Sequence, residues 1–208
     1  MSGCTAKTTK KENVIAVSFY PVYILTLNIT DGIDGLIVEC MAEQNTGCLH
    51  DYTVTAGDAR LLSDCRVFVI NGAGMESFVE DLYETADDLN IVDSSVGATL
   101  ICSHSHEGEE HHAHAHEHSH SENSHIWMSA DNAIVQVENI CNGLSEEFPQ
   151  YEKQFRKNAD EYVARLNSLK NEIAQVKKLL AGESVITFHD AYEYFFADLG
   201  IELSLIHI

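Results

Sequence analysis

The chain has 208 residues, and 33 Asp and Glu against 12 Lys and Arg give it a formal net charge of −21. So acidic a chain argues against nucleic acid as a partner, because Lys and Arg are the residues that meet the phosphate backbone. No run approaches the roughly eighteen consecutive apolar residues of a membrane helix, while 45% hydrophobic residues suffice for a core. Eight of the 12 histidines fall between His104 and His120, so metal binding is the first chemistry to test.

The N-terminal residues 1–13 are polar and lack apolar periodicity, which predicts a flexible tether. Ser2-Gly3-Cys4 resembles the cleavage site of a bacterial lipoprotein, in which the cysteine carries the lipid. The apolar signal segment that normally precedes such a site is absent, so it was removed or never existed. Cys4 is therefore a candidate lipid anchor, and an ordinary flexible start is the alternative.

The remaining five cysteines include no C-x-x-C pair, which argues against a structural zinc knuckle. Cys40 and Cys48 are close enough in sequence to form a disulfide in an oxidising compartment. Most of the five are expected to be buried small hydrophobic side chains.

Strands and helices alternate along the first two thirds of the chain. Short apolar runs predict strands at residues 14–19, 36–41, 66–71 and 91–93. Caps, proline and helical periodicity predict helices between Pro21 and Gly32 and at residues 55–63, 75–89 and 129–148, with Thr55 and Ser129 as N-caps. This alternation predicts an α/β lobe over residues 14–148, built on a parallel sheet that is covered on both faces.

The remainder of the chain predicts one long helix and a second βα unit. Residues 149–181 contain no internal breaker and would span roughly 45 Å as a single rigid helix, enough to join two lobes. Residues 182–208 then predict a strand at 185–188, a helix at 190–199 and a strand at 201–206. A lobe of one βαβ unit cannot cover its own sheet, so we expect the second lobe to be truncated.

Three histidines follow predicted strands at comparable positions. His50 lies beyond the second strand, His125 beyond the fourth, and His189 at the end of the fifth. Side chains far apart in sequence converge at the carboxyl edge of an open parallel sheet. A single loop histidine is ordinarily a surface residue, but three in equivalent positions predict a zinc site with a fourth position for water or a carboxylate.

Four segments around these histidines carry recognisable motifs. They are Gly47-Cys48-Leu49-His50-Asp51-Tyr52 with Thr55-Ala56-Gly57-Asp58, Asn71-Gly72-Ala73-Gly74-Met75-Glu76, His125-Ile126-Trp127-Met128, and Phe188-His189-Asp190-Ala191-Tyr192-Glu193-Tyr194-Phe195. Together they resemble the metal-binding solute-binding proteins of bacterial zinc and manganese ABC transporters, over residues 14–208. The resemblance implies two α/β lobes joined by a rigid helix, with the metal bound between them.

That resemblance also implies a function. Such proteins are extracytoplasmic monomers that capture a metal ion and deliver it to an ABC-transporter permease, with a lipid anchor as the membrane contact. His189 stands where manganese-type relatives tend to carry glutamate, and a third imidazole favours Zn²⁺ as the ligand. Manganese or another divalent metal is the alternative.

The sequence also departs from the family pattern. Leu49 replaces the usual proline before the first ligand, and Ser129-Ala130 replaces Asp-Pro or Ser-Pro after the second motif. Relatives often supply a carboxylate to the metal from a later part of the chain, and no residue here can be named for that position.

A histidine-rich segment at residues 103–124 precedes the second motif. Its composition predicts a loop that is disordered without metal and captures zinc as an auxiliary site. The candidate auxiliary ligands are His104, His106, His111, His112, His114, His116, His118 and His120. A histidine-rich metal buffer that relies mainly on this loop is the alternative function.

The remaining candidate site residues and motifs each have a purely structural interpretation as well as a functional one. Asp51 and Asp190 adjoin two proposed ligands, where they would orient the imidazoles or simply be solvated. Gly72-Ala73-Gly74 lacks the next glycine of a nucleotide-binding fingerprint and predicts a turn. A zinc hydrolase would need a general base, and no H-E-x-x-H helix or nucleophile elbow is present, so no enzymatic activity is expected.

Overall fold

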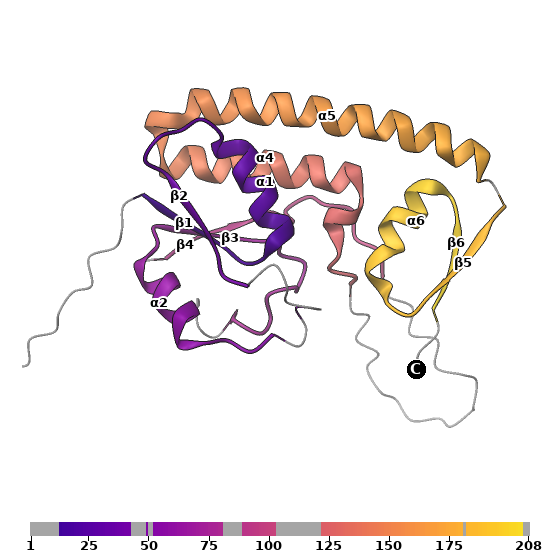
Figure 1. The fold of residues 1–208 in the computed structure, drawn as a ribbon, viewed down its shortest axis with the longest axis horizontal. Coiled ribbons are helices and arrows are strands. Elements are labelled where there is room, and N and C mark those ends of the chain that lie inside the picture. Colours follow the sequence, from indigo (N-terminus) through magenta and orange to yellow (C-terminus); the bar gives the residue numbers. More distant parts are fainter. Residues whose placement is uncertain are drawn as a thin grey trace, which may run out of the picture.

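The computed structural model describes residues 13–42, 49, 52–80, 89–102, 122–180 and 182–205. Two parallel sheets lie under one long helix, α5 (Glu152–Leu179), which passes over both (Figure 1). The larger sheet contains β1 (Val14–Val17), β2 (Ile37–Cys40), β3 (Val67–Ile70) and β4 (Asn90–Asp93) in the order β2-β1-β3-β4. The smaller sheet pairs β5 (Ser184–Thr187) with β6 (Glu202–Leu205). The predicted α/β fold of two lobes joined by a long helix is confirmed.

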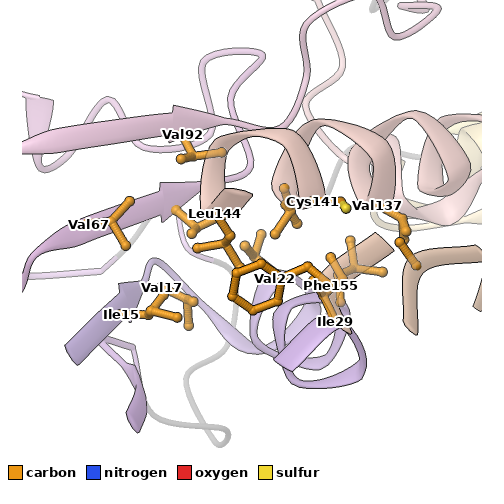
Figure 2. Close-up of a cluster of buried hydrophobic side chains, with 14 of the residues drawn as sticks. Ile15, Val17, Val22, Ile29, Val67, Val92, Val137, Cys141, Leu144 and Phe155 are labelled. Atoms are coloured by element: carbon orange, nitrogen blue, oxygen red, sulfur yellow. The ribbon is translucent and has the colours of Figure 1, made fainter. Parts of the chain in front are cut away.

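The central strands of the larger sheet are buried on both faces. All four residues of β1 and all four of β3 are buried, as continuous apolar runs in a covered parallel sheet should be. Ile15 and Val17 face α1 (Tyr20–Thr30) and α4 (Ala130–Glu147), as Figure 2 shows. Val14 and Ala16 point to the opposite face, which α2 (Ala56–Asp64) covers.

Local sequence signals explain where several helices begin and end. Pro21 lies in the first turn of α1, where its missing N–H has no helical partner to lose. Thr55 and Asp58 form a reciprocal capping box at the start of α2, as the Thr55 prediction required. Asn158 of α5 donates to the carbonyl oxygens of Ile29 and Asp31, so a side chain of one helix closes the C-terminal end of another.

The N-terminal half of helix α5 packs against the first lobe, and the helix also contacts α6 of the second lobe. Phe155, Ala159 and Leu166 are buried against α1 and α4, whereas Leu179 near its end is exposed. The prediction of one unbroken helix from Pro149 is wrong in its first turn. Residues Pro149–Tyr151 form a 3₁₀ turn, η3, because the N–H groups of Tyr151 and Glu152 bond three residues back rather than four.

The second lobe consists of β5, a short 3₁₀ turn η4 (Asp190–Tyr192), α6 (Glu193–Leu199) and β6. Gly200 ends α6 in the left-handed conformation, which glycine adopts without steric cost. Tyr194 and Leu199 are buried, but Ile186 and Phe188 expose 65% and 68% of their surface. The smaller sheet is therefore thinly covered within the described residues.

Two predicted helix features need correction. Met75 lies within a turn rather than at the start of a helix: residues 73–79 are turns, Glu80 is helical, and residues 81–88 lie outside the described part. The Glu76 carboxylate accepts the N–H groups of Asn71 and Gly72, which holds the chain in this turn. Ser129 occupies the N-cap position of α4, but its side chain makes no capping bond, since the 3₁₀ turn η2 (Ile126–Met128) leads directly into the helix.

The turn predicted at the paired glycines is confirmed. Gly72, Ala73 and Gly74 all have positive φ. A Cβ atom on Gly72 would lie 2.0 Å from Oδ1 of Asp93, so only glycine fits beside the end of β4.

Cys40 is a free thiol that donates to the Ala42 carbonyl, so it does not form the disulfide considered with Cys48, which itself lies outside the described residues. Cys65 and Cys141 are buried, as expected of small hydrophobic side chains, whereas Cys102 is exposed, contrary to that expectation. Among the helices that the structure describes, none combines the length and apolar character needed to cross a bilayer.

Candidate metal centre

A cavity of about 270 Å³ opens at the carboxyl ends of the strands. The chain runs from β1 outward to β2 and then returns to β3 on the other side of β1. This switch point leaves a crevice in which open parallel sheets bind their ligands. The cavity is lined by Phe19, Leu49, Met75, His125, Trp127, His189 and Ala191.

His125 and His189 meet in this cavity although they belong to different lobes. Their ring centroids are 5.1 Å apart and their planes are perpendicular. His125 is only 4% exposed, whereas the His189 side chain remains about half exposed. The Asp190 carboxylate oxygen Oδ1 lies 3.5 Å from Nδ1 of His189 and 3.9 Å from Nδ1 of His125. Ligand atoms of these three residues all lie within 4.8 Å of one another.

The ring spacing suits two imidazoles on one ion. A centroid lies about 3.2 Å from a zinc ion bound at a ring nitrogen, so a tetrahedral angle separates two centroids by about 5.2 Å. The observed separation of 5.1 Å is close to that value. Neutral imidazole suits Zn²⁺, while a carboxylate oxygen, which Asp190 offers beside the two rings, also suits Mn²⁺.

Several predicted site residues lie outside the described part of the chain: Cys4, His50, Asp51 and the eight histidines of residues 104–120. Leu49, the residue before His50, is buried and lines the cavity. At the base of the histidine-rich segment, Cys102 and Glu122 form an antiparallel bridge, and the Asn123 N–H donates to the Ile101 carbonyl.

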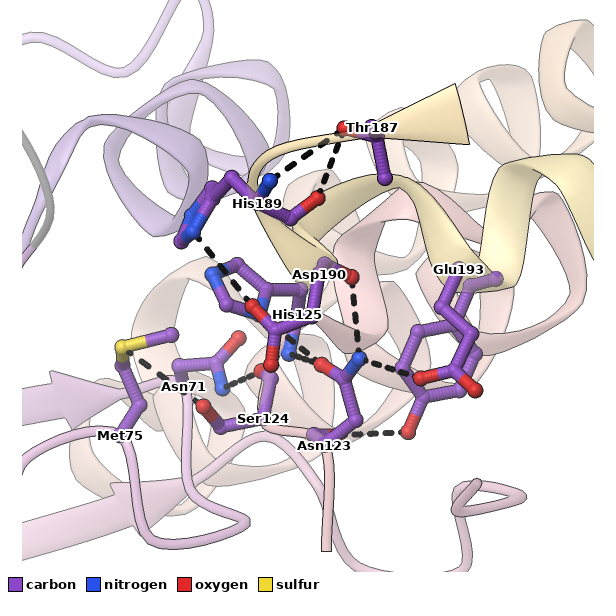
Figure 3. A network of polar contacts seen from close by, with 10 residues as sticks. Asn71, Met75, Asn123, Ser124, His125, Thr187, His189, Asp190 and Glu193 are labelled. Carbon is purple, nitrogen blue, oxygen red and sulfur yellow. Dashed lines mark hydrogen bonds and ion pairs between the residues drawn. The ribbon is translucent and has the colours of Figure 1, made fainter. Parts of the chain in front are cut away.

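Sequence reasoning missed Asn123, which holds His125 in place (Figure 3). Its Oδ1 accepts from the His125 backbone N–H at 3.0 Å and lies 2.8 Å from the His125 ring Nδ1. A metal-binding histidine almost always donates its other ring N–H to such an acceptor. A polar residue two positions before a proposed ligand was the available signal.

Hydrogen bonds tie the two lobes together beside the cavity. The Tyr194 hydroxyl donates to the Asn123 carbonyl at 2.6 Å and accepts from the Ile101 N–H at 3.1 Å. Burial raises the pKa of this phenol, which keeps it a proton donor at neutral pH. On the other side, the Thr187 hydroxyl bonds both backbone groups of His189. Both imidazoles therefore sit on restrained backbone.

A second buried polar network contacts Ser124, the residue before His125. Asn71 donates its side-chain N–H to the Ser124 carbonyl and accepts from the Gln136 amide of α4. Glu76 is almost completely buried, and this burial raises its pKa to about 7 despite the N–H donors of Asn71 and Gly72. These groups fix the turn that carries Met75 into the cavity.

The fold and the cavity define a class of protein: two α/β lobes with a histidine-lined cavity at the carboxyl ends of their strands. Residues 15–208 match the ZnuA family, described as zinc-uptake complex component A, periplasmic. The chain belongs to this family, and the resemblance predicted from the motifs is confirmed.

Individual relatives show the extent of the similarity. The zinc-binding lipoprotein AdcA of Streptococcus pneumoniae (strain ATCC BAA-255 / R6) is 31% identical over 190 residues, covering 90% of this chain and 37% of AdcA. The high-affinity zinc uptake system protein ZnuA of Bacillus subtilis (strain 168) is 29% identical over 192 residues, covering 90% of this chain and 59% of that protein. The crystal structure of Zn(II)-bound AdcA from Streptococcus pneumoniae matches with a TM-score of 0.78 and 28% identity, covering 95% of this chain and 40% of that one. The chain thus spans less than two thirds of the length of these relatives.

Proposed function

We propose that this chain is the metal-capturing part of an extracytoplasmic solute-binding protein, which binds Zn²⁺ and delivers it to the permease of an ABC transporter. The observation that carries the proposal is the meeting of His125, His189 and Asp190 at one strand-end cavity. Imidazole ligands favour zinc. Membership in a zinc-uptake family and the zinc named in its relatives support the same ion.

In this proposal the metal binds Nε2 of His125 and His189. Nδ1 of His125 already faces Asn123, and the Asp190 carboxylate lies toward Nδ1 of both rings, so Asp190 orients the imidazoles rather than binding the ion. His50 supplies the third imidazole and Asp51 a similar orienting carboxylate, on the strength of the sequence motif. Water or a carboxylate completes four-coordinate zinc.

The domain assignment follows the same proposal. Residues 1–13 form a tether whose Cys4 carries a lipid, residues 14–148 the first lobe, 149–181 the linking segment that contains α5, and 182–208 the beginning of the second lobe. The protein acts as a monomer and meets the membrane through its anchor and its permease. Metabolic labelling with a fatty acid tests the anchor, and a Cys4→Ser variant that fractionates as wild type would remove it from the proposal.

Zinc titration in the presence of a competing chelator tests the site. We expect one tight site and weaker additional ones, and His125→Ala or His189→Ala should weaken the tight site at least about tenfold by removing a directly bound nitrogen. Thr8→Ala, in the polar N-terminal segment, is a control that should leave binding unchanged. A tight site that survives both histidine substitutions would contradict the proposal.

Metal choice and proton competition provide two further checks. Mn²⁺ should bind more weakly than Zn²⁺, and the reverse order would make this a manganese-type protein. Zinc affinity should fall as the pH is lowered from about 7 to about 5, because imidazole must be neutral to bind metal. An affinity that does not change over this range would mean that carboxylates hold the ion.

A further inference from the structure

Asn123 uses the full hydrogen-bonding capacity of its side chain although it is only 2% exposed. Its oxygen faces the His125 backbone N–H and the His125 ring Nδ1. Its amino group faces the Asp190 carbonyl at 3.1 Å and the Glu193 carboxylate at 2.8 Å. A carboxamide has two acceptor and two donor positions, and here all four are occupied.

These neighbours determine the protonation of the His125 ring. A backbone N–H is always a donor, so the Asn123 atom that faces it must be the oxygen. The same oxygen lies 2.8 Å from Nδ1 of His125, so this nitrogen must carry a proton. In the neutral ring, the lone pair that can bind a metal is then on Nε2.

The other end of the carboxamide reaches the second lobe. Asp190 directly follows His189, and Glu193 is the first residue of α6. One amide group therefore contacts both the imidazole of the first lobe and the segment that carries the imidazole of the second (Figure 3).

We propose that Asn123 is a positioning residue for the metal site. Its oxygen fixes His125 as the tautomer that presents Nε2 to the ion, and its amino group holds the His189 segment in register with that ring. The inference rests on the proposed function for its effect on zinc. Its effect on the tautomer is a property of the metal-free protein and is tested separately.

An amide is the side chain that this position needs. Aspartate would keep the oxygen that accepts from Nδ1 of His125. Its other oxygen, however, would replace the Asn123 amino group that lies 2.8 Å from the Glu193 carboxylate, so two negatively charged groups would face each other. Asn123→Asp therefore breaks the second-lobe half of the arrangement and leaves the His125 half. Glu193→Gln in the same chain supplies an N–H donor that can face the new carboxylate.

The first test is the tautomer of His125 in the metal-free 208-residue chain. Long-range proton–nitrogen correlation spectra of ¹⁵N-histidine-labelled protein distinguish the two neutral forms, and His125→Gln identifies the signal. We expect the Nδ1-protonated form in the wild type and a partial shift toward the Nε2-protonated form in Asn123→Ala, because the Asp190 carboxylate, 3.9 Å from Nδ1, remains as an acceptor. An Nε2-protonated wild type overturns the proposal without any variant and whatever the zinc affinity.

The second test is zinc affinity by chelator competition. Asn123→Ala should weaken the tight site about 10- to 100-fold, the range usual for loss of a group that orients a ligand. Asn123→Asp should weaken it about tenfold, Glu193→Gln less than about threefold, and the double variant should recover most of the Asn123→Asp loss. Asn167→Asp, the same change on the exposed face of α5, is the matched control.

The outcomes separate the two hypotheses. A wild type that binds no zinc overturns the proposed function, while the tautomer spectrum still decides the role of Asn123. A wild type that binds zinc, with Asn123→Ala and Asn123→Asp binding equally well, overturns the positioning role. If Asn123→Ala does not fold, the wild-type spectrum and the Asn123→Asp, Glu193→Gln pair decide.

Discussion

The two sheets of this protein are both parallel but differ in how they are buried. Strands β1 and β3 are covered on both faces, and Phe68 in β3 is completely buried. Strand β5 alternates exposed and half-buried residues, and Phe188 just beyond it is 68% exposed. The first lobe therefore has a core of its own, while the second relies on its contacts with α5 and with the first lobe.

This difference matters because the candidate site takes one imidazole from each lobe. His125 is buried on the well-packed lobe, and His189 is half exposed on the thinly covered one. Within the described residues, their separation depends on groups that cross between the lobes, among them Asn123, Tyr194 and the α5–α6 contact. The packing of the first lobe and the contacts between the lobes involve different residues, so their effects on stability and on the site can be tested with separate substitutions.

The largest difference between the lobes should appear on truncation of a phenylalanine in each. Phe155→Ala empties a fully buried position between α5 and the first lobe and should lower the free energy of unfolding by about 3–5 kcal/mol. Phe188→Ala should change it by less than about 0.5 kcal/mol, because the ring is exposed. Urea denaturation followed by circular dichroism measures both. Equal losses would mean that the exposed face of β5 is covered in solution.

The second effect is a pH dependence that belongs to the first lobe. Burial raises the pKa of Glu76 to about 7 from an ordinary value of 4.5, so the folded chain retains a proton that the unfolded chain releases. The stability from this group is complete below about pH 4.5 and is lost as the pH rises through about 7, a change of up to about 3 kcal/mol. Glu76→Gln removes this titration. The free energy of unfolding of the variant should therefore increase relative to that of the wild type as the pH rises from about 4.5 to about 7.

Denaturation at a series of pH values measures this effect. Glu138→Gln, on an exposed position of α4, is the matched control and should follow the wild-type curve. Parallel curves for wild type and Glu76→Gln would show that Glu76 does not titrate in this range.

A smaller effect is expected at the contact between the lobes. Tyr194→Phe keeps the ring but removes the hydroxyl that bonds the Asn123 carbonyl and the Ile101 N–H. Leaving these groups without their partner should cost about 1–2 kcal/mol of stability and weaken zinc binding by less than about tenfold. Tyr192→Phe, on a half-exposed ring nearby, is the control. Zinc affinity lowered as much as in His125→Ala would assign Tyr194 a direct role at the metal.

The smallest effect on the tight site should come from the histidine-rich segment. Because Cys102 and Glu122 form an antiparallel bridge, residues 103–121 can be replaced by Asn-Gly, the preferred two-residue hairpin turn. Zinc stoichiometry should fall, while the tight-site affinity stays within about twofold of wild type. Loss of the tight site here, together with its survival in His125→Ala, would make the protein a histidine-rich metal buffer.

The sequence by itself determined most of the fold. Val14–Val17 and Val67–Ile70 are continuous apolar runs, as expected of parallel strands covered on both faces, and both are central strands. The Thr55–Asp58 spacing defines the start of α2, because a capping box is made within one turn of chain. Met75 was misplaced in a helix because the carboxylate that holds its turn acts through backbone groups that have no sequence signature.

The sequence predicted the two histidines of the candidate site but not the asparagine that contacts them. His125 and His189 follow strands, so the rule for parallel sheets predicted that they would meet, and the structure brings them together. Asn123 escaped because its partners Asp190 and Glu193 lie 67 and 70 residues further along the chain. Propensity, capping and periodicity operate over a few residues, so the sequence determines which elements form. Hydrogen bonds between groups of different lobes exist only after packing has fixed their separation, and for that reason the contact of Asn123 with both the His125 ring and the His189 segment was decided by the tertiary structure alone.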